Sequence, residues 1–116
     1  MQDRRQSKRM PMALFIRILV DEKDNMKCET FTQNVSADGA QILSSRPLTQ
    51  NADVLLNIDV PNDPDIVRAE GTVRWVGKHA LEDENGKKVF PIGVEFTYMD
   101  RQDRTFLEEY LYQNAD

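Results

Sequence analysis

Two arginines near the N-terminus, Arg5 and Arg9, are the side chains best suited to bind an anion. A guanidinium group presents several N–H donors in a planar fork, which matches phosphate oxygens and the Hoogsteen edge of guanine. Arg4 and Lys8 add positive charge beside them. The spacing places both arginines on one face of a helix, or about 13 Å apart in an extended segment, and either form can wrap a compact dianion. A terminal charge run that only increases solubility has the same composition.

A second group of polar residues, Asn34-Val35-Ser36-Ala37-Asp38-Gly39, has the composition of a turn. Its Asn amide, its Ser hydroxyl and nearby backbone amides can converge on a ligand. Gly39 allows a positive φ or a close backbone approach because it has no Cβ atom. The alternative interpretation is a polar turn that only joins two strands.

The sequence contains no motif for catalysis. His79 is the only histidine and has no nucleophile motif beside it, and no glycine-rich phosphate loop, HExxH or GxSxG motif occurs. The acidic run Glu82-Asp83-Glu84 precedes Lys87-Lys88, which is typical of a solvated hairpin tip rather than a calcium loop. Cys28 is the only cysteine, which excludes an intrachain disulfide and a cysteine-based zinc site. The sequence therefore predicts neither an enzyme, nor a cofactor, nor a metal site.

Charge is distributed unevenly along the 116 residues. The chain has 15 basic and 20 acidic residues, a net charge of −5, yet residues 1–9 carry four basic groups against one acidic group, or +3. Residues 10–116 therefore hold 11 basic and 19 acidic groups, or −8. Such an acidic body repels polyphosphate, so a general DNA- or RNA-binding protein is not expected. No apolar run approaches the roughly 18–20 residues of a membrane span, so we expect a cytoplasmic protein without membrane insertion.

Short β-prone segments separated by polar turns occupy most of the chain. Apolar and polar residues alternate with period two within the longer segments, as they do in half-buried strands. About six strands joined by short turns favour a small antiparallel barrel or sandwich, so the fold class is mostly β. The segments expected to form strands are 12–20, 27–33, 40–43, 54–60, 66–76 and about 88–97.

The clearest strand is the segment 66–76, where the alternation is longest. The residues that fall on one of its faces are Val67, Ala69, Gly71, Val73 and Trp75. Asn85-Gly86 is the strongest short hairpin signal in the chain. The return strand is expected to turn Ile92, Val94 and Phe96 inward and Gly93 and Glu95 outward.

A change to helical periodicity marks the C-terminal segment. Asp100 is suited to cap a helix that starts at Arg101, and Asp103 is favourable near the positive end of that helix. The residues on its apolar stripe are Phe106, Leu107, Tyr110 and Leu111. We expect this helix, over about 100–114, to pack on one mouth of the barrel. The chain is thus divided into a flexible basic arm over 1–11 and a barrel with its helix over 12–116.

The two polar motifs together, in this order and on this scaffold, resemble those of the PilZ domain family of cyclic di-GMP (c-di-GMP) receptors. The residues that match the family's RxxxR and [D/N]xSxxG motifs are Arg5, Arg9, Asn34, Ser36 and Gly39. The segments 71–75 (GTVRW) and 92–96 (IGVEF) are similar to paired barrel strands of the family. The resemblance covers nearly the whole chain.

The resemblance implies that the chain binds c-di-GMP. In the family, the arginines of the N-terminal arm contact guanine and phosphate, and the arm folds over the dinucleotide. Arg5 and Arg9 are then the principal anchors, and Arg4 is a further candidate for a phosphate contact. The turn residues expected to form the floor of the site are Asn34, Ser36 and Gly39.

Two positions within this expected site leave alternatives open. Trp75 is either a core residue, since it shares a face with Val73, or a platform on which a guanine stacks. Asn34 stands where many family members have aspartate, and an amide offers one acceptor and one donor where a carboxylate offers two acceptors. The family pattern admits both residues, so the substitution bears on affinity rather than on binding itself.

The resemblance also implies a sensor that acts through another protein. Ordering of the arm on the ligand changes the surface that is offered to a downstream protein partner. The pathway of that partner and the number of ligand molecules per site are left open, and so is the choice between a monomer and a ligand-sensitive dimer. The alternative function is a PilZ-like protein-interaction module that does not bind nucleotide.

Overall fold

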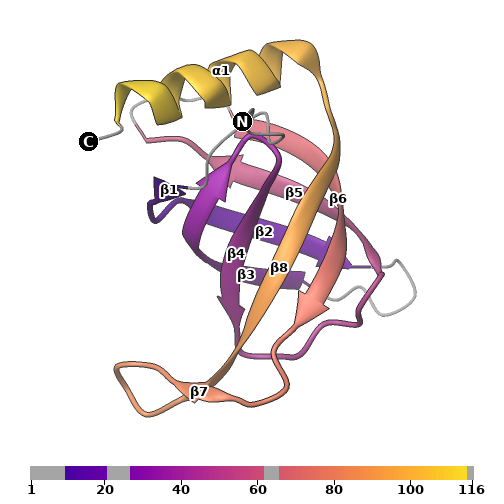
Figure 1. The fold of residues 1–116 in the computed structure, drawn as a ribbon, viewed down its shortest axis with the longest axis vertical. Helices are drawn as coiled ribbons and strands as arrows, with labels where there is room; N and C mark the ends of the chain where they lie inside the picture. The colour runs from indigo at the N-terminus through magenta and orange to yellow at the C-terminus, as the bar shows by residue number, and fades with distance from the viewer. Residues whose placement is uncertain (1–9, 21–26, 62–65, 115–116) are drawn as a thin grey trace, which may run out of the picture.

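Six antiparallel strands form a closed barrel in the computed structural model, which describes residues 10–20, 27–61 and 66–114 (Figure 1). The strands pair in the order β3-β2-β5-β6-β8-β4, and a further β3–β4 pairing closes the ring. Two short strands, β1 and β7, pair with β3 and β8. The elements are β1 (Met10–Pro11), β2 (Phe15–Val20), β3 (Lys27–Ser36), β4 (Gly39–Ser44), β5 (Asp53–Asp59), β6 (Ile66–Val76), β7 (Leu81–Glu82), β8 (Lys88–Met99) and α1 (Arg101–Gln113). The predicted mostly-β barrel with a C-terminal helix is confirmed.

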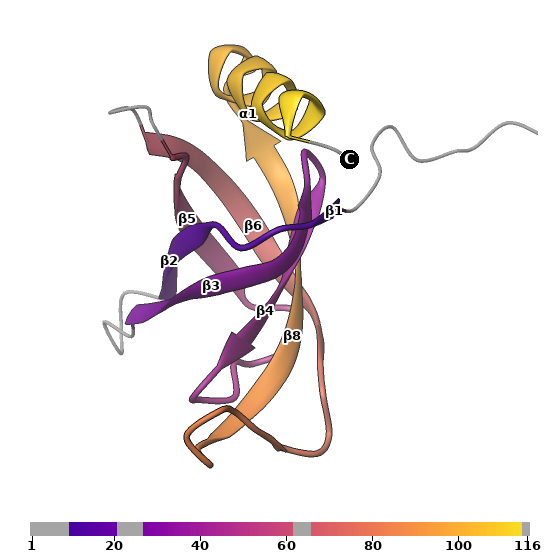
Figure 2. The ribbon, with the colours of Figure 1, turned by 90° about the vertical axis from the view of Figure 1, so that its left-hand side faces the viewer.

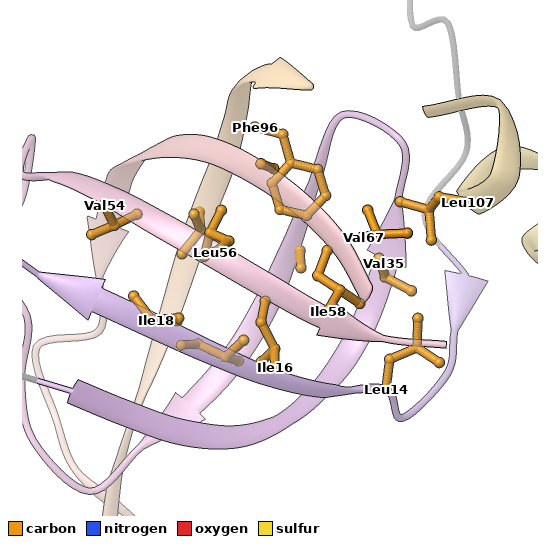
Figure 3. Close-up of a cluster of buried hydrophobic side chains, with 14 of the residues drawn as sticks. Leu14, Ile16, Ile18, Val35, Val54, Leu56, Ile58, Val67, Phe96 and Leu107 are labelled. Carbon is orange, nitrogen blue, oxygen red and sulfur yellow. The ribbon is translucent and has the colours of Figure 1, made fainter. Parts of the chain in front are cut away.

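The core fills the barrel with mainly aliphatic side chains from the six barrel strands (Figure 3). Ile16 and Ile18 of β2 and Ile58 of β5 are fully buried, whereas their sequence neighbours face outward to differing degrees. This alternation is the period-two pattern of the sequence, and burial of the aliphatic residues is the main stabilising contribution to the fold.

The helix α1 lies across one end of the barrel, as expected (Figures 1 and 2). Its side chains Leu107 and Leu111 are buried, and Leu107 belongs to the same cluster as Val35 and Val67 (Figure 3). Asp100 is the N-cap residue, but its side chain makes no capping hydrogen bond, so the expected side-chain cap is wrong. Within the described ranges, no helix is long and apolar enough to cross a membrane.

The first predicted strand, 12–20, is interrupted. Regular pairing of β2 begins at Phe15, and the preceding residues leave the ladder. Buried Thr32 bonds this irregular stretch: its Oγ1 accepts from Leu14 N at 2.9 Å and donates to Met12 O at 2.7 Å. Met10 and Pro11, assigned from sequence to the arm, pair with β3 as β1.

The hairpin expected at Asn85-Gly86 is present between β7 and β8. Asp83 organises its tip, because Asp83 Oδ1 accepts from Asn85 N and Lys87 N, both at 2.8 Å. Gly86 has a φ of +78°, a conformation that glycine adopts without a Cβ penalty. Asp83 of the acidic run therefore fixes the conformation of the loop tip through these hydrogen bonds.

Three irregularities interrupt the strict alternation of the barrel. Each inserts one extra residue into one strand of a pair: Gln33 in β3, Arg74 in β6 and Thr97 in β8. A β-bulge of this kind reverses the side to which the following side chains point, and it often lies next to a functional site. Two of the three determine the orientation of candidate site residues.

Candidate ligand-binding site

The polar motif Asn34–Gly39 is mostly strand rather than turn. Asn34 and Ser36 lie in β3, Gly39 is the first residue of β4, and only Ala37 and Asp38 form the turn between them. Ser36 pairs directly with Gly39. The expectation of a six-residue turn is therefore wrong, because the ladder between β3 and β4 continues to the tip of the hairpin. Among the described glycines, positive φ occurs at Gly86, so Gly39 uses an ordinary strand conformation.

The bulge at Gln33 turns Asn34 to the outer face of the barrel. Strict alternation from buried Thr32 would place Asn34 inside, but the extra residue puts Val35 inside instead, where it is fully buried. Asn34 Nδ2 lies 3.3 Å from Gln41 Oε1, and Gln41 Nε2 lies 3.2 Å from Gln33 Oε1. A chain of amide side chains therefore runs along the outer surface of β3 and β4.

The bulge at Arg74 has the same effect on Trp75. Val73 is fully buried, and the alternation assigned Trp75 to the same face. The extra residue moves Trp75 out of that face, and Trp75 is 39% exposed as a residue. The alternative of a core tryptophan is therefore wrong. The indole instead covers Gly93, where a Cβ atom would lie only 2.1 Å from Trp75 Nε1. Gly93 was expected to face outward, and it is buried because Trp75 lies on it.

These residues form a single row across four adjacent strands. Asn34 of β3 pairs with Gln41 of β4, Gln41 pairs with Gly93 of β8, and Gly93 pairs with Trp75 of β6. Pro11 of β1 extends the row on the other side of Asn34. The row brings an aromatic surface at one end and two carboxamides at the other onto one face. We refer to it below as the outer row.

The charged groups beside the outer row are paired. Glu95, the strand partner of Gly39, forms an ion pair with Arg74, and both side chains are about half exposed. Asp38 in the turn forms an ion pair with Arg104, whose Nη2 lies 3.1 Å from Asp38 Oδ1. Each of these carboxylates has a guanidinium partner, which reduces the repulsion that an anionic ligand would meet here.

The turn itself is held from three sides. Ser36 Oγ accepts from Asp38 N at 3.0 Å, and Asp38 O accepts from Phe96 N of β8 at 2.8 Å. Arg104 of α1 donates to Ala37 O at 3.2 Å in addition to its Asp38 contact. The Ser36 hydroxyl, 1% exposed as a residue, thus has a structural role that fixes the turn.

Replacing Arg104 with alanine is expected to lower the free energy of unfolding by about 1 kcal/mol, because charge-assisted hydrogen bonds to the turn are lost from a partly exposed site. Chemical denaturation measures this loss, and hydrogen exchange of the Asp38 and Phe96 amides should become faster. Glu108→Gln is the matched control, since it removes only the i,i+4 pair of Arg104. Unchanged exchange at both amides in Arg104→Ala would contradict the assigned role.

Of the residues predicted from sequence, Asn34, Ser36 and Gly39 gather at the β3–β4 end of the barrel, and Trp75 lies in the same outer row as Asn34. Arg4, Arg5 and Arg9 lie outside the described residues. Sequence reasoning missed Gln41 and Arg104. The position of Gln41, two residues after Gly39, was a usable signal, since alternate residues share a face.

The described residues show no group of three or more His, Cys, Asp or Glu side chains suited to hold a metal ion. Cys28 is partly buried, and its Sγ lies 3.4 Å from Ser44 Oγ. The polar chemistry near the β3–β4 hairpin is therefore that of amides, guanidinium groups and one indole, which suits an anionic ligand with aromatic bases better than a metal.

Solved structures with the same fold cover almost the whole chain. The inhibitor of motility MotI/DgrA of Bacillus subtilis matches 97% of it with a TM-score of 0.73 at 21% identity. The PilZ domain of Escherichia coli YcgR, solved with c-di-GMP, matches 96% with a TM-score of 0.70 at 11% identity. The K. pneumoniae MrkH–c-di-GMP complex matches 97% with a TM-score of 0.69 at 15% identity.

The chain spans about half of MotI (51%) and of MrkH (52%), and 91% of the YcgR domain. Comparison with curated proteins finds no match. The family model of the PilZ domain matches residues 3–113, which includes both polar motifs. With the barrel, its helix and the motif hairpin in place, the chain belongs to the PilZ domain family, whose members are non-enzymatic c-di-GMP receptors.

Proposed function

We propose that this chain is a c-di-GMP receptor that binds the dinucleotide over the outer row and relays the signal to a partner protein. The observation that carries the proposal is the outer row itself. Two bulges bring Asn34 and Trp75 to the same face, and the positions between them hold the Gln41 carboxamide and Gly93, which has no side chain.

The guanine bases are assigned to the two ends of the outer row. The indole of Trp75 offers a face for stacking, which is favourable for any base because every base has a π surface. Asn34 and Gln41 offer amide donors and acceptors that complement the polar edge of guanine. Both kinds of contact are needed to distinguish a guanine dinucleotide from a simple anion.

The phosphates are assigned to the N-terminal arginines. The described chain begins at Met10, which is joined to Arg9 by one peptide bond and pairs with Val35 of β3. The point at which residues 1–9 join the described chain therefore lies beside the motif strand. Arg5 and Arg9 are the proposed anchors, and Arg4 is a further candidate for a phosphate contact.

The signal is proposed to pass through a protein partner rather than through chemistry. Ordering of the basic segment on the dinucleotide would change the exposed surface of the barrel. A cytoplasmic location belongs to this proposal, because the intracellular messenger has to reach the receptor. Either a monomer or a ligand-sensitive dimer is compatible with this relay.

Calorimetric titration with c-di-GMP tests the proposal directly, because it yields affinity and stoichiometry together. We expect binding heat, and we expect the backbone amide resonances of Ser36 and Gly39 to shift. Absence of both would favour the alternative module that binds protein and no nucleotide.

GMP is expected to compete poorly with c-di-GMP, since a mononucleotide cannot bridge the arginine motif and the outer row. Displacement of bound c-di-GMP by increasing GMP measures this selectivity. Equally effective competition by GMP would instead indicate a general anion site.

A further inference from the structure

A groove on the far side of the barrel exposes apolar side chains to solvent. The proposed ligand site is centred on β4 and the groove on β5, and two strands separate β4 from β5 in either direction around the ring. The groove has a volume of about 460 Å³. Its apolar lining consists of Leu19, Leu55, Leu56, Ala69 and Tyr98.

The apolar lining includes three side chains that protrude. Leu19 pairs with Leu55, Leu55 with Glu70, and Glu70 with Tyr98, so these residues form one row across β2, β5, β6 and β8. Leu55 is 56% exposed and Tyr98 is 59% exposed. A small molecule inside the groove would leave most of this protruding surface in water, whereas a protein segment laid across the row would cover it.

Three carboxylates line the groove beside its apolar side chains. Glu70 lies between Leu55 and Tyr98 in the row, and Asp100 and Asp103 lie at the start of α1. With Arg68 as the one basic lining residue, three acidic groups and one basic group give a net charge of −2. Asp103 Oδ2 accepts a hydrogen bond from the backbone N of Arg68 at 3.1 Å, so that contact adds no compensating charge. In the described part of the chain, none of the three carboxylates takes part in an ion pair.

We propose that this groove binds a segment of a partner protein that carries a large apolar side chain flanked by Lys or Arg. The exposed apolar side chains select the large side chain, and the carboxylates beside them select the basic flanks. The inference rests on the proposed receptor function in one respect: a receptor that catalyses no reaction needs a surface through which it contacts its partner protein. Because the groove and the ligand site lie on opposite sides, the partner and the nucleotide can bind at the same time.

The groove also adjoins an element that reaches the ligand side. Asp100 and Asp103 lie at the start of α1, and Arg104, the next residue of that helix, contacts the turn at Ala37 and Asp38. The first turn of α1 thus contacts the groove and the motif hairpin through neighbouring residues.

A titration of the nucleotide-free full chain with a synthetic amphipathic peptide of Leu and Lys tests the proposal. We expect shifts of the backbone amides of Leu55, Glu70 and Tyr98, and little binding of the same peptide with Glu in place of Lys. Since no nucleotide is present, the outcome is independent of whether c-di-GMP binds.

Two pairs of matched variants separate a specific groove from general adhesion. Leu55→Ser should weaken peptide binding at least tenfold, whereas Leu81→Ser, at a leucine of similar exposure in β7, should leave it unchanged. Glu70→Lys should likewise weaken binding, and Glu82→Lys in β7 should have a smaller effect.

Three results would overturn the proposal: amide shifts outside the groove, equal binding of the acidic peptide, or wild-type affinity in Leu55→Ser. Sedimentation of the chain without peptide adds a further test. A dimer that Leu55→Ser converts to a monomer would mean that a second copy of the chain, and not a basic segment, covers the groove.

Discussion

Replacing Arg9 or Arg5 with alanine is expected to weaken c-di-GMP binding by about 1–3 kcal/mol in each case, or roughly five- to 150-fold in affinity. Each guanidinium can form two parallel hydrogen bonds to a guanine edge or a phosphate, and alanine removes both together with the charge. Calorimetric titration of the two variants against wild type measures the loss.

Lys8→Ala is the matched control, because it removes the same charge from a position between the two motif arginines. An ammonium group acts as a point charge without the planar fork, so this variant should lose much less affinity. Wild-type affinity in either arginine variant would mean that this arginine does not contact the ligand. An equal loss in Lys8→Ala would mean that charge, and not bidentate recognition, governs binding.

The fold was predictable where the sequence alternates over a long stretch. The predicted strand 66–76 agrees with β6 over its full length, because a strand with one buried face needs an apolar residue at every second position. The apolar stripe of α1 was equally informative, since Leu107 and Leu111 are its buried residues. Both signals are local and depend only on which side of the element faces the core.

The bulges were not predictable from the same pattern. An extra residue such as Gln33 or Arg74 changes the face of everything after it, yet no residue type marks its position reliably. Alternation therefore assigned Trp75 to the face of Val73, and the polar composition of residues 34–39 assigned Asn34 to a turn rather than to a strand. These errors concern residues of the proposed site, where bulges are most common.

The site was predictable in its motif residues and not in its supporting contacts. Asn34, Ser36 and Gly39 are close in sequence, so a pattern can identify them together. Arg104 lies 66 residues beyond Asp38, and only the packing of α1 on the barrel brings the two together. A contact of this kind depends on tertiary structure and has no local sequence signal.

Trp75 is the second residue whose replacement should have a large effect on the ligand. Trp75→Ala is expected to weaken c-di-GMP binding by about 1–3 kcal/mol, the range found when a base loses an aromatic stacking partner. Trp75→Phe should lose less, because an aromatic face remains. Trp75 is the only tryptophan in the chain, so binding of a guanine against it should change the intrinsic fluorescence of the wild-type protein.

Gly93→Ala tests the position of the indole without removing it. A Cβ atom at this position would lie 2.1 Å from Trp75 Nε1, so the indole has to move away from the barrel surface. Because Trp75 is already 39% exposed as a residue, its indole can move at modest cost in stability, and its emission should shift toward that of an indole in water. We expect weaker c-di-GMP binding with near wild-type unfolding. Binding at wild-type affinity in both Trp75→Ala and Gly93→Ala would place the guanines away from β6, and the part of the outer row that contacts the ligand would then end at Gln41.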